Sequence, residues 1–563
     1  MNQNKRYNIA FILLLLAVVF FALPWHQGFT VGDCGDYLNA ANQLLHGNWD
    51  IQNNFYANRI GTYLPYAIGM KLFGFGTWLT LITTIEFLLL LSVIYYTVKR
   101  YNTSIAFMAC SLLGTSAIML QNASVVMGDM ASTLCCNAMV LCYFYFTFYA
   151  GQKQTNQKRW GISVAALFFL SFLVKESVVF FLPFMLWQYF KSRKNETQKI
   201  FWKYAFGTTV LLVLTLLLAY LIKTGNPFYR IIAVETGPTS SDCNYVNASW
   251  LTILNRITWQ PFQFLTQNYT FSFLLLLSFL QLFQYRKDAS IQEKFFQHYF
   301  IFSIAMWWMG SQSLTSYNPV SLVHRIWLPL LVPMAINASF FITALRKGTT
   351  TNPIYSVLFI FVFLLFTFWS LFISIGIYAN SNIEQTSAFI SIAVRDTILG
   401  SVVIFSLYKS KLFTTTSIMG YLLFIAIIIF PVKSCLESVL WRYLNFKSKY
   451  SLQKEMLDYA TSYKPKSILT DYWILKGYPI YLGFDKKFHF VNYTEVDTFS
   501  NNTYLLLNKI TQFELEKNIN ETRIFTKAKN KIPDFVLQPT KHGFILIKEN
   551  ETNLLYRYID HAE

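Results

Sequence analysis

Charged residues in the first third of the chain are of the types that could do chemistry. Asp33 and Asp36 lie in the stretch GDCGDY, and Asp129 lies in VMGDMAST. Lys175 and Glu176 follow one another between two apolar, phenylalanine-containing stretches. A carboxylate can deprotonate or orient a hydroxyl group, and a nearby cation can stabilise an anionic leaving group. These residues are far apart in the chain, so only the fold could bring them together.

The elements that must position these residues cross a membrane. The chain has 563 residues, of which 54% are hydrophobic and 13% are charged, whereas soluble proteins are about 25% charged. Apolar stretches of about 20 residues, long enough to span a bilayer, recur along the chain. This composition excludes a soluble enzyme and a disordered chain. We therefore predict an α-helical polytopic membrane protein.

The net charge of +18 could indicate a nucleic-acid partner, but the distribution of the basic residues argues against one. They lie in short clusters between apolar stretches, as membrane proteins place them on the cytoplasmic side. The clusters include Lys5-Arg6, Lys99-Arg100 and Arg286-Lys287. This pattern predicts a cytoplasmic N-terminus.

We expect a transmembrane domain over residues 1–444 with about 11–13 spans. Its first outside loop, 26–76, is polar and then amphipathic, which predicts two short helices on the membrane surface. Apolar stretches near 354–377, 390–408 and 415–432 form the last three predicted spans.

The composition changes after the last span. Residues 445–563 contain 14 of the 28 acidic residues and no long apolar stretch. The strand-like pieces SILTDYWI, PIYLGF, TYLLLN and GFILIK alternate there with polar segments. We predict a soluble extracytoplasmic α/β domain.

In this topology, the loops that follow the first, third and fifth spans emerge on the same outer side. A carboxylate beside the bilayer is costly unless it is paired or functional. We therefore expect Asp33, Asp36 and Asp129 to meet in a cavity at the outer face. The candidate cations and phosphate ligands on that face are Arg59, Lys175, Arg230, Arg256, His324 and Arg325.

Such a cavity suits the transfer of a sugar from a polyprenyl-phosphate donor. The acceptor hydroxyl needs a carboxylate, and the leaving phosphate needs cations. We predict an inverting membrane glycosyltransferase in which Asp33 or Asp36 is the base and Asp129 is a second carboxylate. Lys175 and Arg325 would neutralise the phosphate.

Each residue also has a simpler structural interpretation. Asp33 and Asp36 could cap a surface helix, and Asp129 could cap the fourth span. Lys175 could lie at a solvated hairpin tip, and Arg325 could anchor its span at the membrane surface. These alternatives stay open for the individual residues.

The order of the motifs resembles the GT-C membrane glycosyltransferases. The pattern Asp-x-x-x-Tyr-x-x-x-Ala-x-x-Leu, from Asp33 to Leu44, follows the first span, and Arg59 lies in NRIGTYLPYAIGMKLFG. VMGDMAST, VKES, GNPFYR and HRIWLPLLVP follow in that order. Over about residues 1–345, the chain is similar to the family 39-like group, which contains the dolichyl-phosphate-mannose-protein mannosyltransferases and the aminoarabinose lipid A transferases.

The resemblance implies roles for three residues. Asp33 matches the catalytic aspartate of the first loop, Asp129 the acidic residue between spans three and four, and Lys175 the lysine that opens the next hairpin. The family's loop often reads Asp-Glu, whereas Cys34 follows Asp33 here. The choice between Asp33 and Asp36 as the base therefore stays open. So does a divalent metal ion, which the aminoarabinose enzymes can hold beside these acids.

The expected partners are a polyprenyl-phosphate-linked sugar, a lipid, glycan or protein acceptor, and membrane lipids. Further candidates for substrate contact are Arg59, Glu176, Arg230 and His324. A composition rich in Lys, Asn, Ile and Phe is typical of an AT-rich bacterial genome, which indicates a bacterial cytoplasmic membrane. Two alternative functions stay open: a lipid-linked oligosaccharide polymerase or ligase, and a transporter of lipid-linked sugars, which would place charges along a path through the membrane.

Overall fold

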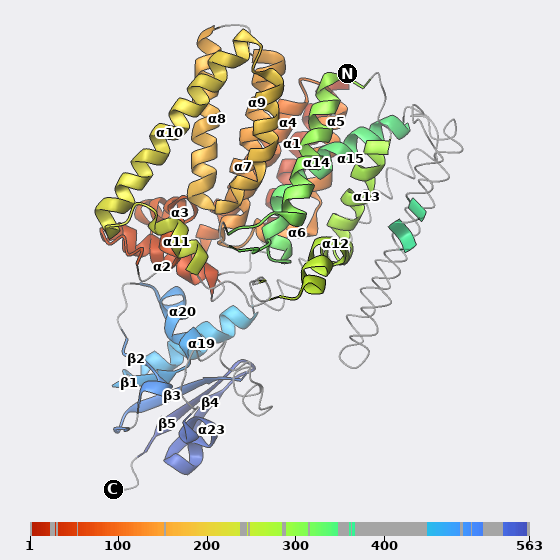
Figure 1. The fold of residues 1–563 in the computed structure, drawn as a ribbon. Coiled ribbons are helices and arrows are strands. Elements are labelled where there is room, and N and C mark those ends of the chain that lie inside the picture. Colours follow the sequence, from red (N-terminus) through yellow and green to blue (C-terminus); the bar gives the residue numbers. More distant parts are fainter. Residues whose placement is uncertain are drawn as a thin grey trace.

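The computed structural model contains a bundle of helices followed by a small sheet domain (Figure 1). It describes residues 3–22, 29, 32–52, 55–150, 154–236, 245, 248–283, 289–313, 316–346, 360–361, 363–365, 448–484, 488–496, 498–509 and 533–559. The spans predicted at 390–408 and 415–432, and most of the one at 354–377, lie outside these residues.

Five described helical segments are long and apolar enough to cross a membrane, which confirms an integral membrane protein. These segments correspond to α1 (Gln3–Ala22), α4 (Thr80–Val98), α7 (Gly128–Tyr145), α10 (Glu196–Thr224) and α15 (Leu328–Arg346). The bundle also contains α5 (Thr103–Gly114), α6 (Ala117–Asn122), α8 (Gln154–Val174), α9 (Leu182–Ser192), α12 (Trp250–Thr266), α13 (Tyr269–Phe283) and α14 (Ile291–Met309). The third predicted span, at about residues 104–121, is thus divided into α5 and α6.

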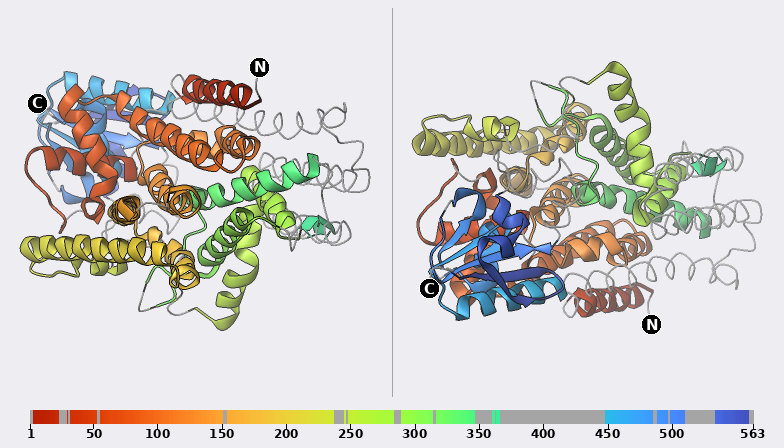
Figure 2. Two further views of the ribbon diagram at one scale, coloured as in Figure 1. Left: turned by 90° about the horizontal axis from the view of Figure 1, so that it is seen from above. Right: turned by 90° about the horizontal axis from the view of Figure 1, so that it is seen from below.

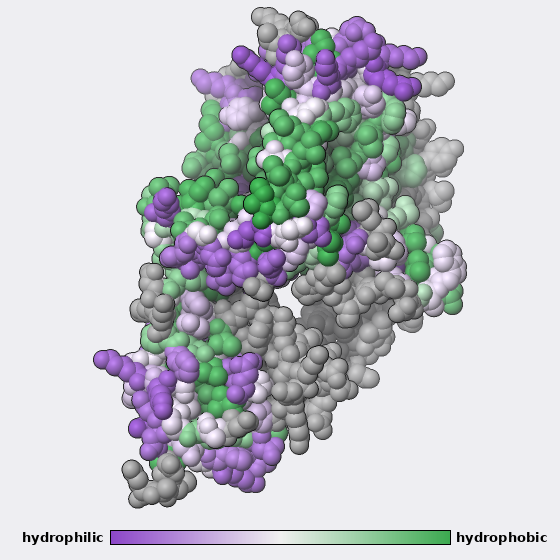
Figure 3. All heavy atoms as spheres, turned by 60° about the vertical axis from the view of Figure 1, so that its left-hand side comes forward, coloured by the Kyte–Doolittle hydropathy of each residue, from purple (hydrophilic) through white to green (hydrophobic). Residues whose placement is uncertain are grey.

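The outer surface of α10 shows why this bundle belongs in a bilayer. Leu211, Leu214, Leu218 and Ile222 are each more than half exposed. Figure 3 shows the apolar surface as a green band between hydrophilic residues at either end. Lipid removes such side chains from water, whereas a soluble protein would leave them in it.

The segment predicted as the first outside loop contains two short helices, α2 (Asp33–Leu45) and α3 (Ile60–Phe73), separated by the 3₁₀ turn η1 (Phe55–Asn58). Figure 1 places them at one end of the upright helices, beside α11 (Tyr229–Thr236). Gly32 precedes α2 with a φ of 104°, a conformation that favours glycine.

Three further segments reach the same end of the bundle. α7 begins directly after the extended residue Met127. Lys175 is extended and separates α8 from the 3₁₀ turn η4 (Glu176–Phe181). The 3₁₀ turn η6 (His324–Trp327) leads into α15. Helix ends and turns therefore carry the charged residues toward one place.

The C-terminal region forms a five-stranded sheet of order β2-β1-β3-β5-β4. Strands β2, β1 and β3 are parallel, and β5 is antiparallel to β3 and β4. The strands are β1 (Ser467–Thr470), β2 (Phe490–Asn492), β3 (Thr503–Asn508), β4 (Phe544–Glu549) and β5 (Asn553–Tyr558), with helices α19 (Ser448–Ser462), α20 (Tyr472–Leu482) and α23 (Asp534–Leu537). This confirms an α/β domain.

One strand prediction was wrong. PIYLGF lies largely at the end of α20 and is not a strand. Ile474, Gly477 and Ile480 are buried at a spacing of three, which matches one face of a helix. By contrast, β1 and β3 lie within the pieces SILTDYWI and TYLLLN, and β4 covers all of GFILIK except its glycine and extends one residue beyond it.

Candidate active site

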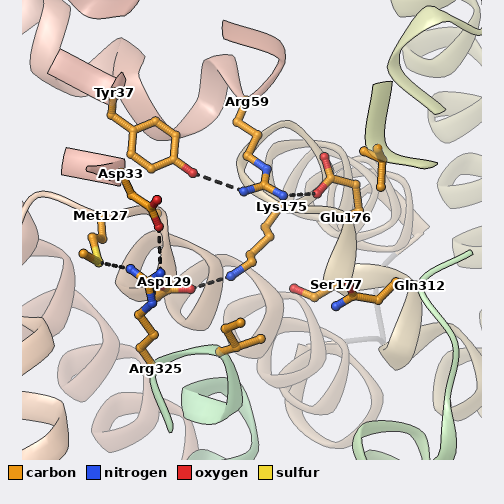
Figure 4. A pocket seen from close by; sticks show the side chains of 13 residues that line it. Asp33, Tyr37, Arg59, Met127, Asp129, Lys175, Glu176, Ser177, Gln312 and Arg325 are labelled. Carbon is orange, nitrogen blue, oxygen red and sulfur yellow. Dashed lines mark hydrogen bonds and ion pairs between the residues drawn. The ribbon is translucent and has the colours of Figure 1, made fainter. Parts of the chain in front are cut away.

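A cavity of about 150 Å³ lies where these helix ends meet (Figure 4). It brings together Asp33, Asp129, Lys175 and Arg325, which come from four different segments of the chain. The full lining is Asp33, Tyr37, Arg59, Met127, Gly128, Asp129, Lys175, Glu176, Ser177, Val234, Gln312, Arg325 and Ile326.

Asp33 accepts hydrogen bonds on both carboxylate oxygens. Arg325 Nη2 lies 2.7 Å from Oδ2, and the Tyr56 hydroxyl donates to Oδ1 over 2.6 Å. Burial alone would raise the pKa of Asp33, but the charge of Arg325 and these hydrogen bonds outweigh burial and lower the pKa below its ordinary value. Gly32 is the N-cap of α2, which has no side-chain cap, so Asp33 is not a capping residue.

Arg325 lies between two carboxylates of the cavity, those of Asp33 and Asp129. Its Nε is 3.9 Å from Asp129 Oδ2, and its Nη1 is 2.7 Å from Met127 Sδ. Lys175 Nζ donates to Asp129 Oδ1 over 2.5 Å. The N-cap of α7 is Met127, which makes no side-chain cap bond. Asp129 therefore pairs with the side chains of Lys175 and Arg325 and does not cap its helix. Two positive groups therefore face two carboxylates in one small space.

Glu176, which also lines the cavity, forms a second charged network. Arg59 Nη2 lies 3.1 Å from Glu176 Oε2, and Arg230 Nη2 lies 3.0 Å from Oε1. Burial disfavours the charged carboxyl, but the charges of Arg59 and Arg230 more than offset this and lower the pKa of Glu176 to about 2. Arg59 Nη1 also donates to the Tyr37 hydroxyl over 3.3 Å. This network joins the first loop to the hairpin after α8.

Some predicted site residues lie outside the cavity lining. Arg230 is buried and donates to the backbone carbonyls of Asn58, over 2.9 Å, and of Phe172. The ring of His324 stacks on Phe264, with the ring centroids 4.3 Å apart. Asp36 is buried on α2.

Arg256 also lies away from the cavity. Its guanidinium donates to the carbonyls of Trp308, over 3.1 Å, and Val320, over 2.7 Å. Arg230 and Arg256 thus both donate to backbone carbonyls and hold neighbouring segments in place. Their sequence positions near predicted outer loops did not distinguish this use from phosphate binding.

Sequence reasoning missed several lining residues. Tyr37 follows Asp33 by four positions, so helical spacing places both on one face of α2 and could have identified it. Ser177 and Gln312 lie together at the other end of the cavity in Figure 4, away from Asp33. Neither belongs to a recognisable motif, because a loop brings Gln312 to the cavity.

The charged residues of the cavity do not fit a divalent metal site. Within the described part of the chain, no three His, Cys, Asp or Glu side chains group together. Asp33, Asp129 and Glu176 each lie against Lys or Arg, whereas Mg²⁺ and Ca²⁺ sites gather oxygen ligands around the ion. We therefore assign no chemical step to a metal.

Comparisons with known proteins agree on the type of fold. Residues 62–221 match the family model described as dolichyl-phosphate-mannose-protein mannosyltransferase. The structure of ArnT from Cupriavidus metallidurans bound to undecaprenyl phosphate is similar, with a TM-score of 0.58, 11% identity and 99% of each chain covered. The resemblance to the GT-C glycosyltransferases is confirmed.

The apo structure of the same ArnT is also similar, with a TM-score of 0.53, 11% identity and coverage of 99% of this chain and 98% of that one. A search of curated proteins finds no match. The family model and the GT-C-like fold together indicate a membrane glycosyltransferase. Asp129 and Lys175 lie within the matched segment.

Proposed function

We propose that the protein transfers a sugar from a polyprenyl-phosphate donor to an acceptor hydroxyl, with inversion, and that Asp33 is the base. The single observation that carries this proposal is the pairing of Asp33 and Asp129 with Arg325 and Lys175 in one cavity. The ArnT structure bound to undecaprenyl phosphate supports a donor of this lipid class through its similar fold.

In the proposed reaction, Asp33 accepts the proton of the acceptor hydroxyl as its oxygen attacks the anomeric carbon. The bond from that carbon to the phosphate oxygen breaks, and the polyprenyl phosphate leaves with the electron pair. Arg325 and Lys175 stabilise the negative charge that develops on the phosphate. Attack opposite the leaving phosphate inverts the anomeric centre.

Asp33 suits the role of base better than Asp36 does. Asp33 lines the cavity and is about a third exposed, whereas Asp36 is almost fully buried on α2. A base must be within hydrogen-bond reach of the hydroxyl that it deprotonates. Arg325 now binds Asp33, and its guanidinium has five N–H donors, so it can bind a phosphate as well.

The proposed membrane placement follows from the basic clusters. Lys191, Arg193 and Lys194 lie at the end of α9, far from the cavity end of the bundle in Figure 1. The positive-inside rule would place that end in the cytoplasm. The cavity would then face outward from a bacterial inner membrane. The C-terminal domain, which we propose begins after residue 444, would lie on the same outer side.

The direct test is a donor panel. Purified protein is incubated with radiolabelled polyprenyl-phosphate and polyprenyl-pyrophosphate sugars, and with lipid and protein extracts as acceptors. We expect the label to move from a monophosphate donor to an acceptor. Transfer only from pyrophosphate donors, or movement of intact donor across vesicles without transfer, would overturn the proposal.

A further inference from the structure

The C-terminal domain packs directly on the helix that carries Asp33. α20 of that domain contacts α2, and Ile480 is buried to 2% exposure in the same apolar cluster as Cys34 and Tyr37. In Figure 1 the blue C-terminal domain lies at the α2 end of the bundle, and in the views from above and below in Figure 2 it overlaps the red segments near the start of the chain. The domain is therefore part of the surroundings of the cavity.

The two helices approach each other closely at Gly35. A Cβ atom added to Gly35 would lie 2.6 Å from Ile480 Cδ1 and 3.8 Å from its Cγ1. Alanine is the better helix former, so local propensity does not favour glycine within α2. A larger residue at this position would have to displace the buried Ile480 side chain of α20.

Helix geometry places this contact behind the proposed base. Successive residues of an α-helix are rotated by about 100°, so Gly35 points about 200° away from Asp33 on α2. Asp33 faces the cavity, and Gly35 faces Ile480. α2 is thus held between Arg325 on one side and the C-terminal domain on the other.

Aromatic residues that precede and follow α20 in the chain extend the same interface. Phe29 and Tyr450 make an edge contact with centroids 6.3 Å apart, and Phe75 and Phe484 make another at 5.1 Å. Phe29 and Phe75 belong to the outer loop region, whereas Tyr450 and Phe484 belong to the C-terminal domain. An interface of this kind fixes the distance between the two parts.

From this packing we infer that Ile480 is a positioning residue: through Gly35, the C-terminal domain sets the position of Asp33 relative to Arg325. This inference rests on the proposed function, because Asp33 is the proposed base. It assigns the soluble domain a part in catalysis without any contact to substrate. A shift of about 1 Å at a reacting group can lower turnover by about 100-fold.

A pair of matched substitutions tests the contact. Gly35→Ala adds the colliding Cβ, and Ile480→Val removes only the Cδ1 atom with which it collides. We expect Gly35→Ala to lower kcat by roughly 10- to 100-fold with little change in donor KM. We expect the double variant to recover to within about threefold of wild type, a recovery that a helix-propensity effect would not produce.

Ile474→Val is the control in the same helix. Ile474 is buried in the apolar core of the C-terminal domain and not in the cluster with α2. Its substitution removes the same methyl group but should leave kcat near wild type. Wild-type kcat in Gly35→Ala, or no recovery in the double variant, would overturn the inference.

A measurement without turnover separates this inference from the proposed function. Ile480→Ala should increase hydrogen exchange of the α2 amides while those of α14 stay unchanged. If the wild-type protein transfers no sugar, the proposed function fails, and this exchange comparison still tests the docking of α2. If Ile480→Ala leaves the hydrogen exchange of the α2 amides unchanged, this would contradict the inference that α20 holds α2 in position.

Discussion

At the scale of single residues, the charges of the site work as neighbouring pairs. Arg325 contacts Asp33 and lies 3.9 Å from Asp129, while Lys175 binds Asp129. Charged groups near a bilayer are costly when unpaired, so the site is stable before a substrate arrives. The same cations can then stabilise a phosphate.

The salt bridges from Glu176 to Arg59 and Arg230 should stabilise the fold, so removing the Glu176 charge should lower the free energy of unfolding. Glu176→Gln would leave Arg59 and Arg230 without their shared negative partner, and we expect it to cost about 3 kcal/mol. Thermal unfolding in detergent measures this. Lys199→Gln, which removes the exposed salt bridge to Glu196, is the control. It should lower the free energy of unfolding by less than about 1 kcal/mol, so the melting temperature should fall by a few degrees at most.

The same carboxyl predicts a pH dependence. The pKa of Glu176 is about 2 in the folded protein, against an ordinary value of 4.5. A lowered pKa stabilises the fold above the ordinary value, and this stabilisation is lost as pH falls from about 4.5 to 2. Melting temperatures should therefore fall more steeply over this range in wild type than in Glu176→Gln. Parallel curves would contradict the assignment.

At the scale of elements, the starts and ends of helices position the site. Asp33 and Asp129 lie in the first turns of α2 and α7, where the helix dipole favours negative charge. Lys175 lies directly after α8, and Arg325 lies in the turn before α15. Small backbone changes at these ends should therefore move the charges.

Gly32 is the sharpest such position. Its φ of 104° is disfavoured for any side chain, so we expect Gly32→Ala to cost about 1–3 kcal/mol and to displace the start of α2. Gly207→Ala is a matched control, because a Cβ there meets nothing within 4 Å. It should keep or raise the melting temperature. Equal melting temperatures for both variants would exclude strain at Gly32.

The elements also show where sequence reasoning succeeds. Long apolar helices and the surface helices of the first loop are local patterns, and they were predicted. The convergence of Asp33, Asp129 and Lys175 followed from the alternation of loops across the membrane. α20 was missed because PIYLGF is a short apolar stretch whose periodicity is ambiguous.

Contacts between residues far apart in the chain decide the roles of the other site residues, and sequence reasoning could not predict these contacts. Arg230 and Arg325 are both basic residues near predicted outer loops, yet Arg230 binds backbone carbonyls while Arg325 lines the cavity. Tyr56 reaches Asp33 across 23 positions, and Gln312 reaches the cavity from a loop. None of these arrangements follows from spacing within one element.

At the scale of the whole molecule, the cavity and the sheet domain lie at the same end of the bundle (Figure 1). The proposed topology places this end outside the cell.

This orientation can be tested by labelling single cysteines. Ser462→Cys on the C-terminal domain should react with a membrane-impermeant maleimide in intact cells. Lys194→Cys at the opposite end should react only after permeabilisation. Both side chains are exposed, and wild type measures the background from native cysteines. The reverse labelling pattern would contradict the orientation.

The claim that matters most is that Asp33 works as the base within this cavity. Turnover of a polyprenyl-phosphate sugar by wild type, Asp33→Asn and Asp36→Asn tests it most directly, with donor binding measured in parallel. We predict that Asp33→Asn lowers kcat by roughly 10²–10⁴-fold with donor binding retained, while Asp36→Asn lowers it by less than about tenfold. Near-wild-type turnover by Asp33→Asn, or the larger loss in Asp36→Asn, would contradict the account.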